Sequence, residues 1–250
     1  MPVENLIYYL LIFSIVTLQS VVGVGVLVLG TPLLLIFEYS IVESISILLP
    51  ISILTSMINI IFIKVTNKKI ILNLNKDVKK AFFTLCLPAV FIGIFLLKNF
   101  QDLINFKAFV AFIILTTLCL KLYYKNKVIN FSNLIKKIIL FFIGLIHGMS
   151  NSGGTLLSIF ILSINRNLKN QTRYSLTFFY FFLALFQYLI FIIIFQSMIS
   201  YHLLTNIILI TVAGSLFGNF LVKFIAEIYF QFLIELLAIL AAILLIISSL

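Results

Sequence analysis

The stretch NLIYYLLIFSIVTLQSVVGVGVLVLGTPLLLIF, residues 5–37, is a long, mostly apolar run without a single charge. As one straight helix it would be about 50 Å long at 1.5 Å per residue, whereas the hydrocarbon core of a bilayer is about 30 Å thick. Gly23-Val24-Gly25 and Gly30-Thr31-Pro32 interrupt the run, and glycine and proline disfavour a continuous helix. Residues 5–37 therefore predict a membrane segment that is broken or re-entrant.

A second run of this kind covers residues 134–163, and the polar, glycine-rich stretch from His147 to Thr155 interrupts it. The remaining apolar segments are each close to the ~20 residues that a membrane-crossing helix needs. They are residues 41–63, 81–97, 105–122, 174–195, 203–222 and 230–249. The fold class predicted is an all-α polytopic membrane protein with about eight hydrophobic segments, of which the first and fifth are broken.

Composition agrees with this class. Of 250 residues, 63% are hydrophobic and 10% charged, whereas soluble domains have about half apolar and a quarter charged residues. A soluble enzyme, a nucleic-acid-binding domain and a disordered chain are thereby excluded, and continuous apolar runs disfavour a β-barrel. The net charge of +10 comes from clusters such as 64–80 and 121–137, which is typical of cytoplasmic loops. We expect a multi-pass protein of the cell (plasma or inner) membrane, with the lipid bilayer and not nucleic acid as its partner.

The two halves of the sequence resemble each other. Placing Gly25 on Gly148 puts Gly30 on Gly153, and further on Gly93 matches Gly218. Such matches indicate an internal duplication. We predict one transmembrane transporter domain over residues 1–250, made of repeats at approximately 5–122 and 134–249.

Two topologies are open for the long segments. If each crosses the membrane once, eleven basic residues lie on one side and six on the other; if each forms a hairpin, the division is fifteen against two. The positive-inside rule favours the hairpins, which would place the N-terminus, Glu38 and Glu43 outside. The halves would then be inverted repeats, as in many transporters.

The two breaks are the strongest candidates for a binding site. A half-helix that begins at a break presents free N–H groups and a positive dipole end, which attract anions. Side chains that can hydrogen-bond an oxyanion lie beside them. The candidate substrate-binding residues are Gly25, Gly30, Thr31, Pro32, His147, Ser150, Asn151, Ser152, Gly153, Gly154 and Thr155. The alternative is that the glycines only allow close helix packing.

Few other residues suggest chemistry. His147 at the break and Glu235 within an apolar segment are the candidates for proton coupling, because ionisable groups inside membranes are often functional. Cys86 and Cys119 lie in apolar runs without metal-ligand spacing, and no hydrolase or phosphate-binding motif occurs. We expect no enzymatic activity, no metal and no cofactor.

Two stretches resemble signatures of the TauE/SafE sulfite exporter family. Gln19 to Gly25 followed by Gly30-Thr31-Pro32-Leu33-Leu34 is similar to the first, and Gly144 to Gly148 followed by Gly153 to Leu157 is similar to the second. Thr155 stands where the family usually has proline, and Val26 and Leu27 stand in place of a run of glycines. The resemblance implies a secondary transporter of small anions such as sulfite, sulfonates, related sulfur oxyanions or carboxylates.

The function predicted is therefore transport of a small anion, with the anion held between the breaks. A channel-like facilitator and a non-transporting membrane subunit are the alternatives. A second copy of the chain is a further candidate partner.

Overall fold

The computed structural model describes residues 2–66, 74–101, 132–165, 169–196 and 201–226, with scattered positions in 103–119 and 229–247. Over these residues the chain is helical and contains no strand, which confirms the all-α class. The helices are α1 Pro2–Val22, α2 Val26–Ile36, α3 Ile41–Thr66, α4 Lys76–Ala81, the π-helical turn η1 Phe82–Cys86, α5 Leu87–Phe100, α7 Asn133–Ser150, α8 Gly153–Asn165, α9 Lys169–Phe195, α10 Tyr201–Leu221 and the 3₁₀ turn η2 Val222–Phe224.

Among the described residues, five helical stretches are long and apolar enough to cross a membrane. They are Ile41–Thr66, Lys76–Phe100, Asn133–Ser150, Asn170–Phe195 and Thr205–Phe224. The chain is thus a polytopic membrane protein, as predicted. The predicted segments 105–122 and 230–249 fall mostly outside the described residues, and so does Glu235.

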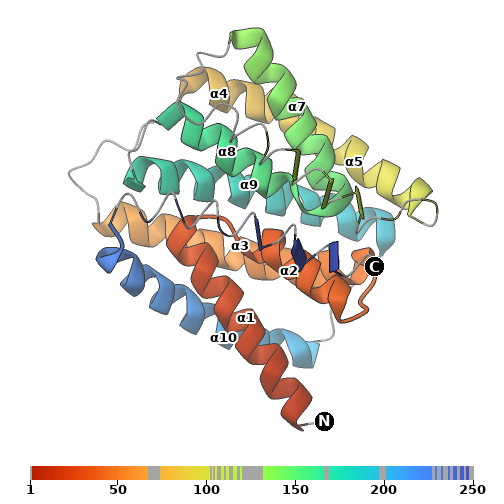
Figure 1. The fold of residues 1–250 in the computed structure, drawn as a ribbon, viewed down its shortest axis with the longest axis vertical. Helices are drawn as coiled ribbons and strands as arrows, with labels where there is room; N and C mark the ends of the chain where they lie inside the picture. The colour runs from red at the N-terminus through yellow and green to blue at the C-terminus, as the bar shows by residue number, and fades with distance from the viewer. Residues whose placement is uncertain are drawn as a thin grey trace.

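Each long segment is a pair of helices that folds back on itself (Figure 1). Gly23 ends α1 in a left-handed conformation, with φ of 97°, and Asn151 ends α7 in the same way, with φ of 61°. After each turn the next helix returns beside the previous one: a Cβ on Gly30 of α2 would lie 3.2 Å from Ile15 of α1. These hairpins are the second of the two topologies considered from the sequence.

Two expectations about the glycines are wrong. Gly30, Thr31 and Pro32 do not interrupt the helix but lie within α2, where all three are buried. Pro32 removes one backbone hydrogen bond, and packing outweighs that loss because Gly30 lets α2 approach Leu48 of α3 closely. The match of Gly25 with Gly148 is also out of register, since Gly25 precedes α2 whereas Gly148 lies inside α7.

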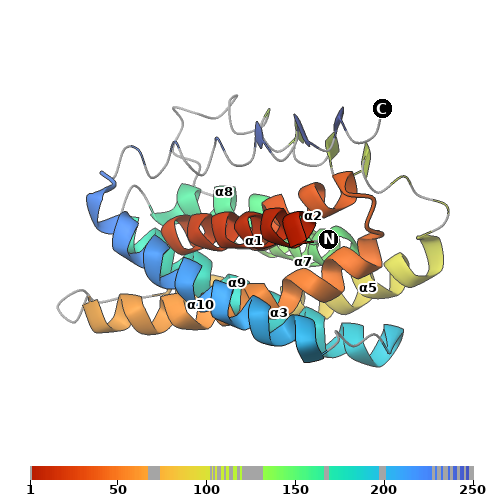
Figure 2. The ribbon, with the colours of Figure 1, turned by 90° about the horizontal axis from the view of Figure 1, so that it is seen from below.

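The helices pack in a reciprocal pattern across the two predicted repeats. α1 packs along α10, α7 packs along α5, and α3 packs against α9 between them. Figure 2 shows α1 and α2 lying over α3 and α10. Glycines bring the paired backbones together: a Cβ on Gly93 would lie 2.2 Å from the Leu145 carbonyl oxygen, and one on Gly218 would lie 2.5 Å from that of Thr17.

Basic residues gather at one end of the bundle. The C-terminal ends of α3, α8 and α10 and the N-terminal ends of α4, α7 and α9 lie together at the upper left of Figure 1. This basic end carries Lys64, Lys76, Lys79, Lys80, Lys136, Lys137, Lys169, Arg173 and Lys223. Lys98, Glu38 and Glu43 belong to helix ends on the opposite side. The distribution agrees with the hairpin topology.

Candidate functional site

The first break, between α1 and α2, is closed by the side chain of Gln19. Its Oε1 accepts a hydrogen bond of 2.9 Å from the Val26 N–H, the first of α2. Its Nε2 donates to the Ser52 carbonyl at 3.2 Å and to Ser56 Oγ at 3.1 Å. Gly25 lies directly against Gln19, since a Cβ there would be 3.1 Å from the Gln19 nitrogen. The polar groups of Gln19 are therefore satisfied by the protein itself.

The second break, between α7 and α8, is one residue shorter than the first but closes with the same kind of backbone hydrogen bond, and it has another residue in the place of Gln19. The Gly23 N–H donates to the Gln19 carbonyl at 2.7 Å, and the Asn151 N–H donates to the His147 carbonyl at 2.9 Å. Gln19 and His147 thus each lie four residues before the left-handed residue. Helix geometry leaves the N–H groups of Gly153 and Gly154 without an acceptor inside α8.

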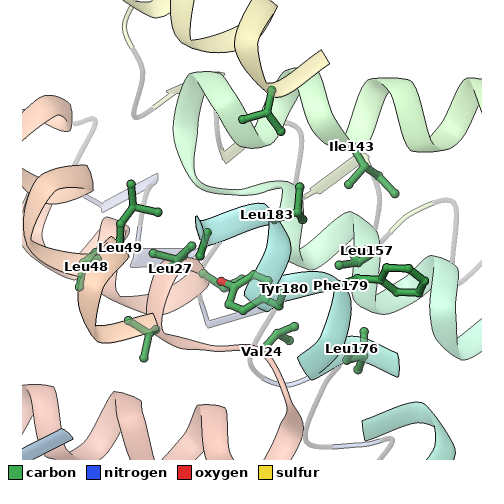
Figure 3. Packing of buried hydrophobic residues seen from close by; sticks show 14 of the residues in the cluster. Val24, Leu27, Leu48, Leu49, Ile143, Leu157, Leu176, Phe179, Tyr180 and Leu183 are labelled. Atoms are coloured by element: carbon green, nitrogen blue, oxygen red, sulfur yellow. The ribbon is translucent and has the colours of Figure 1, made fainter. Parts of the chain in front are cut away.

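The two breaks meet inside the molecule. Asn151 Nδ2 donates to Thr31 Oγ1 across 3.3 Å, which joins the second break to α2. A Cβ on Gly154 would lie 3.0 Å from Val28 of α2 and 2.6 Å from the ring of Tyr180 on α9. Figure 3 shows the Tyr180 ring here, its hydroxyl pointing toward Leu27 in the first turn of α2. The N-terminal turns of α2 and α8 and the ring of Tyr180 therefore lie together in the interior of the protein.

Four buried side chains around the second break have polar atoms without a hydrogen-bond partner among the described residues. These atoms are Nδ1 and Nε2 of His147, Oδ1 of Asn151, the hydroxyl of Tyr180 and Oε1 of Gln187. The Tyr180 oxygen also faces the backbone N–H groups of Leu27 and Val28 in the first turn of α2, so it is the O–H proton that lacks an acceptor. Gln187 is held in place because its Nε2 donates to the His147 carbonyl at 3.1 Å. The imidazole and the Tyr180 ring are neighbours, with centroids 6.0 Å apart. We call His147, Asn151, Tyr180 and Gln187 the second-break cluster.

Three predicted donors already donate to the protein. The hydroxyls of Ser150, Ser152 and Thr155 donate to the carbonyls of Ile146, Ser150 and Ser152, respectively. They can offer a ligand only their lone pairs. Of the side chains expected to bind an anion, His147 and Asn151 keep unpartnered atoms, and Thr31 contacts Asn151. Gly25 lies against Gln19, Gly30 lies against Leu48 of α3 and Ile15 of α1, and Pro32 is buried within α2.

The second-break cluster is sealed in this conformation. His147, Asn151, Tyr180 and Gln187 are all 0% exposed, so no water-filled passage touches them. Within the described part of the chain, no group of three or more His, Cys, Asp or Glu side chains could hold a metal ion.

The family model of the sulfite exporter TauE/SafE matches residues 8–245. This chain belongs to the TauE/SafE family. The match covers both hairpins and every described helix that forms the cluster, and it establishes a membrane transporter. Searches of curated proteins and of solved structures give no match.

Tyr180, Arg173 and Gln187 were not among the binding residues predicted from the sequence of this TauE/SafE protein. A signal was present in α9, a helix otherwise rich in phenylalanine and leucine. Arg173, Thr177, Tyr180, Ala184 and Gln187 recur at spacings of four and three, which places them on one face. This face is buried against the breaks, since a Cβ on Gly23 would lie 3.1 Å from Thr177 Oγ1.

Proposed function

We propose that the chain is a secondary transporter of small oxyanions, such as sulfite, sulfonates, related sulfur oxyanions or carboxylates, that bind at the second break. The observation that carries the proposal is the second-break cluster of buried, unpartnered polar atoms at the start of α8. A buried polar group without a partner costs about 1–3 kcal/mol. A ligand that supplies these hydrogen bonds would remove this cost.

The chemistry of the cluster suits an oxyanion that carries a proton. Tyr180 and one imidazole nitrogen donate, while Gln187 Oε1 and the other imidazole nitrogen accept. Exchanging the amide nitrogen and oxygen of Asn151 would let Thr31 donate to it and leave a free N–H₂ for the ligand. The dipole of α8 and the free N–H groups of Gly153 and Gly154 favour negative charge. A sulfonate offers this set its acceptor oxygens, and hydrogensulfite offers in addition a donor for Gln187 Oε1.

The sealed site supports transport by alternating access rather than a channel. Because the cluster is 0% exposed, an anion reaches it only after one side of the bundle opens. The two halves, as inverted repeats, would rock against each other. The reciprocal packing of α1 on α10 and α7 on α5 supports this arrangement. By the positive-inside rule the basic end would face the cytoplasm.

In this proposal the protein does no covalent chemistry. His147 is the candidate proton carrier, because its imidazole lies in the cluster with both nitrogens unpartnered. Glu235 stays a second candidate on sequence grounds alone.

The experiment that tests the proposal is uptake of ³⁵S-labelled sulfite by proteoliposomes, with Tyr180→Phe as the variant. We expect saturable uptake by the wild type and a loss of about 10- to 100-fold in the variant at low sulfite, because a hydrogen bond to a charged group contributes about 1.5–3 kcal/mol. Tyr188→Phe is the matched control, since Tyr188 lies on the same helix two turns away and is only half-buried. Equal uptake by both variants, or none by the wild type, would contradict the proposal.

A further inference from the structure

Arg173 is a buried cation that lies outside the second-break cluster. It lies one turn into α9, close to the basic end, and is 3% exposed. Its backbone carbonyl lies against the first break, where a Cβ on Gly23 would be 3.1 Å away. A cation that enters the membrane-spanning region is costly unless it has a specific role.

The guanidinium is held by neutral oxygens. Nε donates to the Ser20 carbonyl at 3.0 Å, and Nη2 donates to the same carbonyl and to Asn219 Oδ1, the latter at 2.6 Å. Asn219 Nδ2 in turn donates to Asn59 Oδ1 at 2.6 Å and to the Ser215 carbonyl at 2.8 Å. These five residues, which we call the arginine cluster, join α1, α3, α9 and α10.

The carboxyl end of α1, which Arg173 caps, balances only part of the charge on the guanidinium. Ser20 is in the last turn of α1, whose carboxyl end carries about half an elementary negative charge. The guanidinium carries a full positive charge, and its other acceptor is an uncharged amide. The remaining charge is therefore without an anionic partner among the contacts that hold Arg173.

The rest of the arginine cluster adds donors. Ser20 Oγ, Ser215 Oγ and Asn59 Nδ2 are buried and have no partner among the described residues. A guanidinium can bind two oxygens of one oxyanion with parallel N–H bonds, and hydroxyl and amide donors complete such a site. The unpartnered atoms of the second-break cluster include donors and acceptors, whereas those of the arginine cluster are two hydroxyls and an amide nitrogen, all of which can donate.

We propose that Arg173 is a second anion-binding position, which takes a small oxyanion such as a sulfonate or sulfite between the second break and the basic end. This inference rests on the proposed transport function. The oxyanion replaces the Ser20 carbonyl and the Asn219 amide oxygen as the acceptor of the guanidinium. Its arrival thus replaces the hydrogen bonds by which the guanidinium joins α9 to α1 and α10.

The test is thermal unfolding of the purified full-length protein, followed by circular dichroism, in methanesulfonate and in chloride at equal ionic strength. A ligand that binds only the folded state raises the melting temperature. We expect the wild type to melt at a higher temperature in methanesulfonate, Arg173→Gln and Tyr180→Phe each to lose part of that rise, and the double variant to lose all of it. Lys223→Gln is the control, because Lys223 is an exposed cation at the same end and its loss should leave the rise intact.

The outcomes separate the two proposals. A full rise in Arg173→Gln overturns the role of Arg173 and leaves the second break in place. A full rise in Tyr180→Phe that is absent in Arg173→Gln supports Arg173 and contradicts the second break. No rise in the wild type overturns the Arg173 proposal, and sulfite uptake then decides the transport function by itself. If Arg173→Gln does not fold, Arg173→Lys keeps the charge without the paired N–H geometry, and we expect it to lose about half of the rise.

Discussion

At the first break the side chain of Gln19 makes hydrogen bonds to α2 and α3, whereas at the second break His147, in the matching place before the turn, makes none with its ring. Both turns use a left-handed residue and the same backbone hydrogen bond. The two breaks therefore differ chiefly in the hydrogen bonding of their side chains. In our proposal the first hairpin is a structural element, and the second uses its free hydrogen-bonding capacity to hold a ligand.

We expect the largest loss of stability when Gln19 is replaced, and a smaller loss when Gln187 is replaced. Gln19→Leu removes the bonds to Val26, Ser52 and Ser56, so we expect the free energy of unfolding to fall by about 2–4 kcal/mol. Gln187→Leu at the second break removes one bond, to the His147 carbonyl, and should cost about 1 kcal/mol. Denaturant titration of both variants measures this. Equal losses would contradict the distinction between the breaks.

Making the second break resemble the first should stop transport without unfolding the protein. In His147→Gln the new amide can accept from the free N–H groups of α8, as Gln19 does at α2. We expect sulfite uptake to fall by about 10- to 100-fold, with an unchanged or higher melting temperature. Normal uptake by this variant would show that the unpartnered imidazole is not needed.

The glycine contact between α5 and α7 and the one between α10 and α1 should contribute similarly to the free energy of unfolding. Gly93→Ala and Gly218→Ala each drive a methyl group into a carbonyl of the partner helix, and each should lower the free energy of unfolding by about 1–3 kcal/mol. Gly30→Ala is the control, since its new methyl meets the flexible end of Leu48 and should cost less than about 1 kcal/mol. Strongly unequal values for Gly93 and Gly218 would weaken the inverted-repeat proposal.

The smallest effect concerns a single hydroxyl. Tyr180→Phe removes an O–H that has no acceptor but also an oxygen that faces the N–H groups of Leu27 and Val28, so we expect the stability of the ligand-free protein to change by less than about 1 kcal/mol. Ser56→Ala at the first break removes the acceptor of Gln19 Nε2 and should lower stability by about 1 kcal/mol. Thermal melts in chloride compare the two variants, and a loss of stability in Tyr180→Phe larger than that in Ser56→Ala would show that the protein satisfies the whole hydroxyl.

Much of the fold could be predicted from segment length and from glycine position. The excess length of residues 5–37 and 134–163 predicted that both segments are broken or re-entrant, and the charge distribution favoured the hairpins over a single crossing. The prediction of a helix break at Gly30 and Pro32 was wrong. Packing on α3 accommodates both residues within a helix, and a sequence does not reveal that packing.

The site was predictable only in part. His147 and Asn151 stood out beside the break, but Tyr180 joins them from a helix more than twenty residues away. Its partners depend on how α9 rotates against α2 and α8. Arg173 was not singled out from the sequence, and only the structure shows that its guanidinium is buried against α1 and α10.

The most direct test of the central claim, that the second break and not the first binds the transported anion, is anomalous X-ray diffraction from crystals of the protein grown with selenite. Selenite has the shape and charge of sulfite, and selenium can be located by its anomalous scattering. We predict a selenium peak between Tyr180, His147 and the start of α8. A peak beside Gln19 and Ser56, or no peak at either break at saturating selenite, would contradict the account.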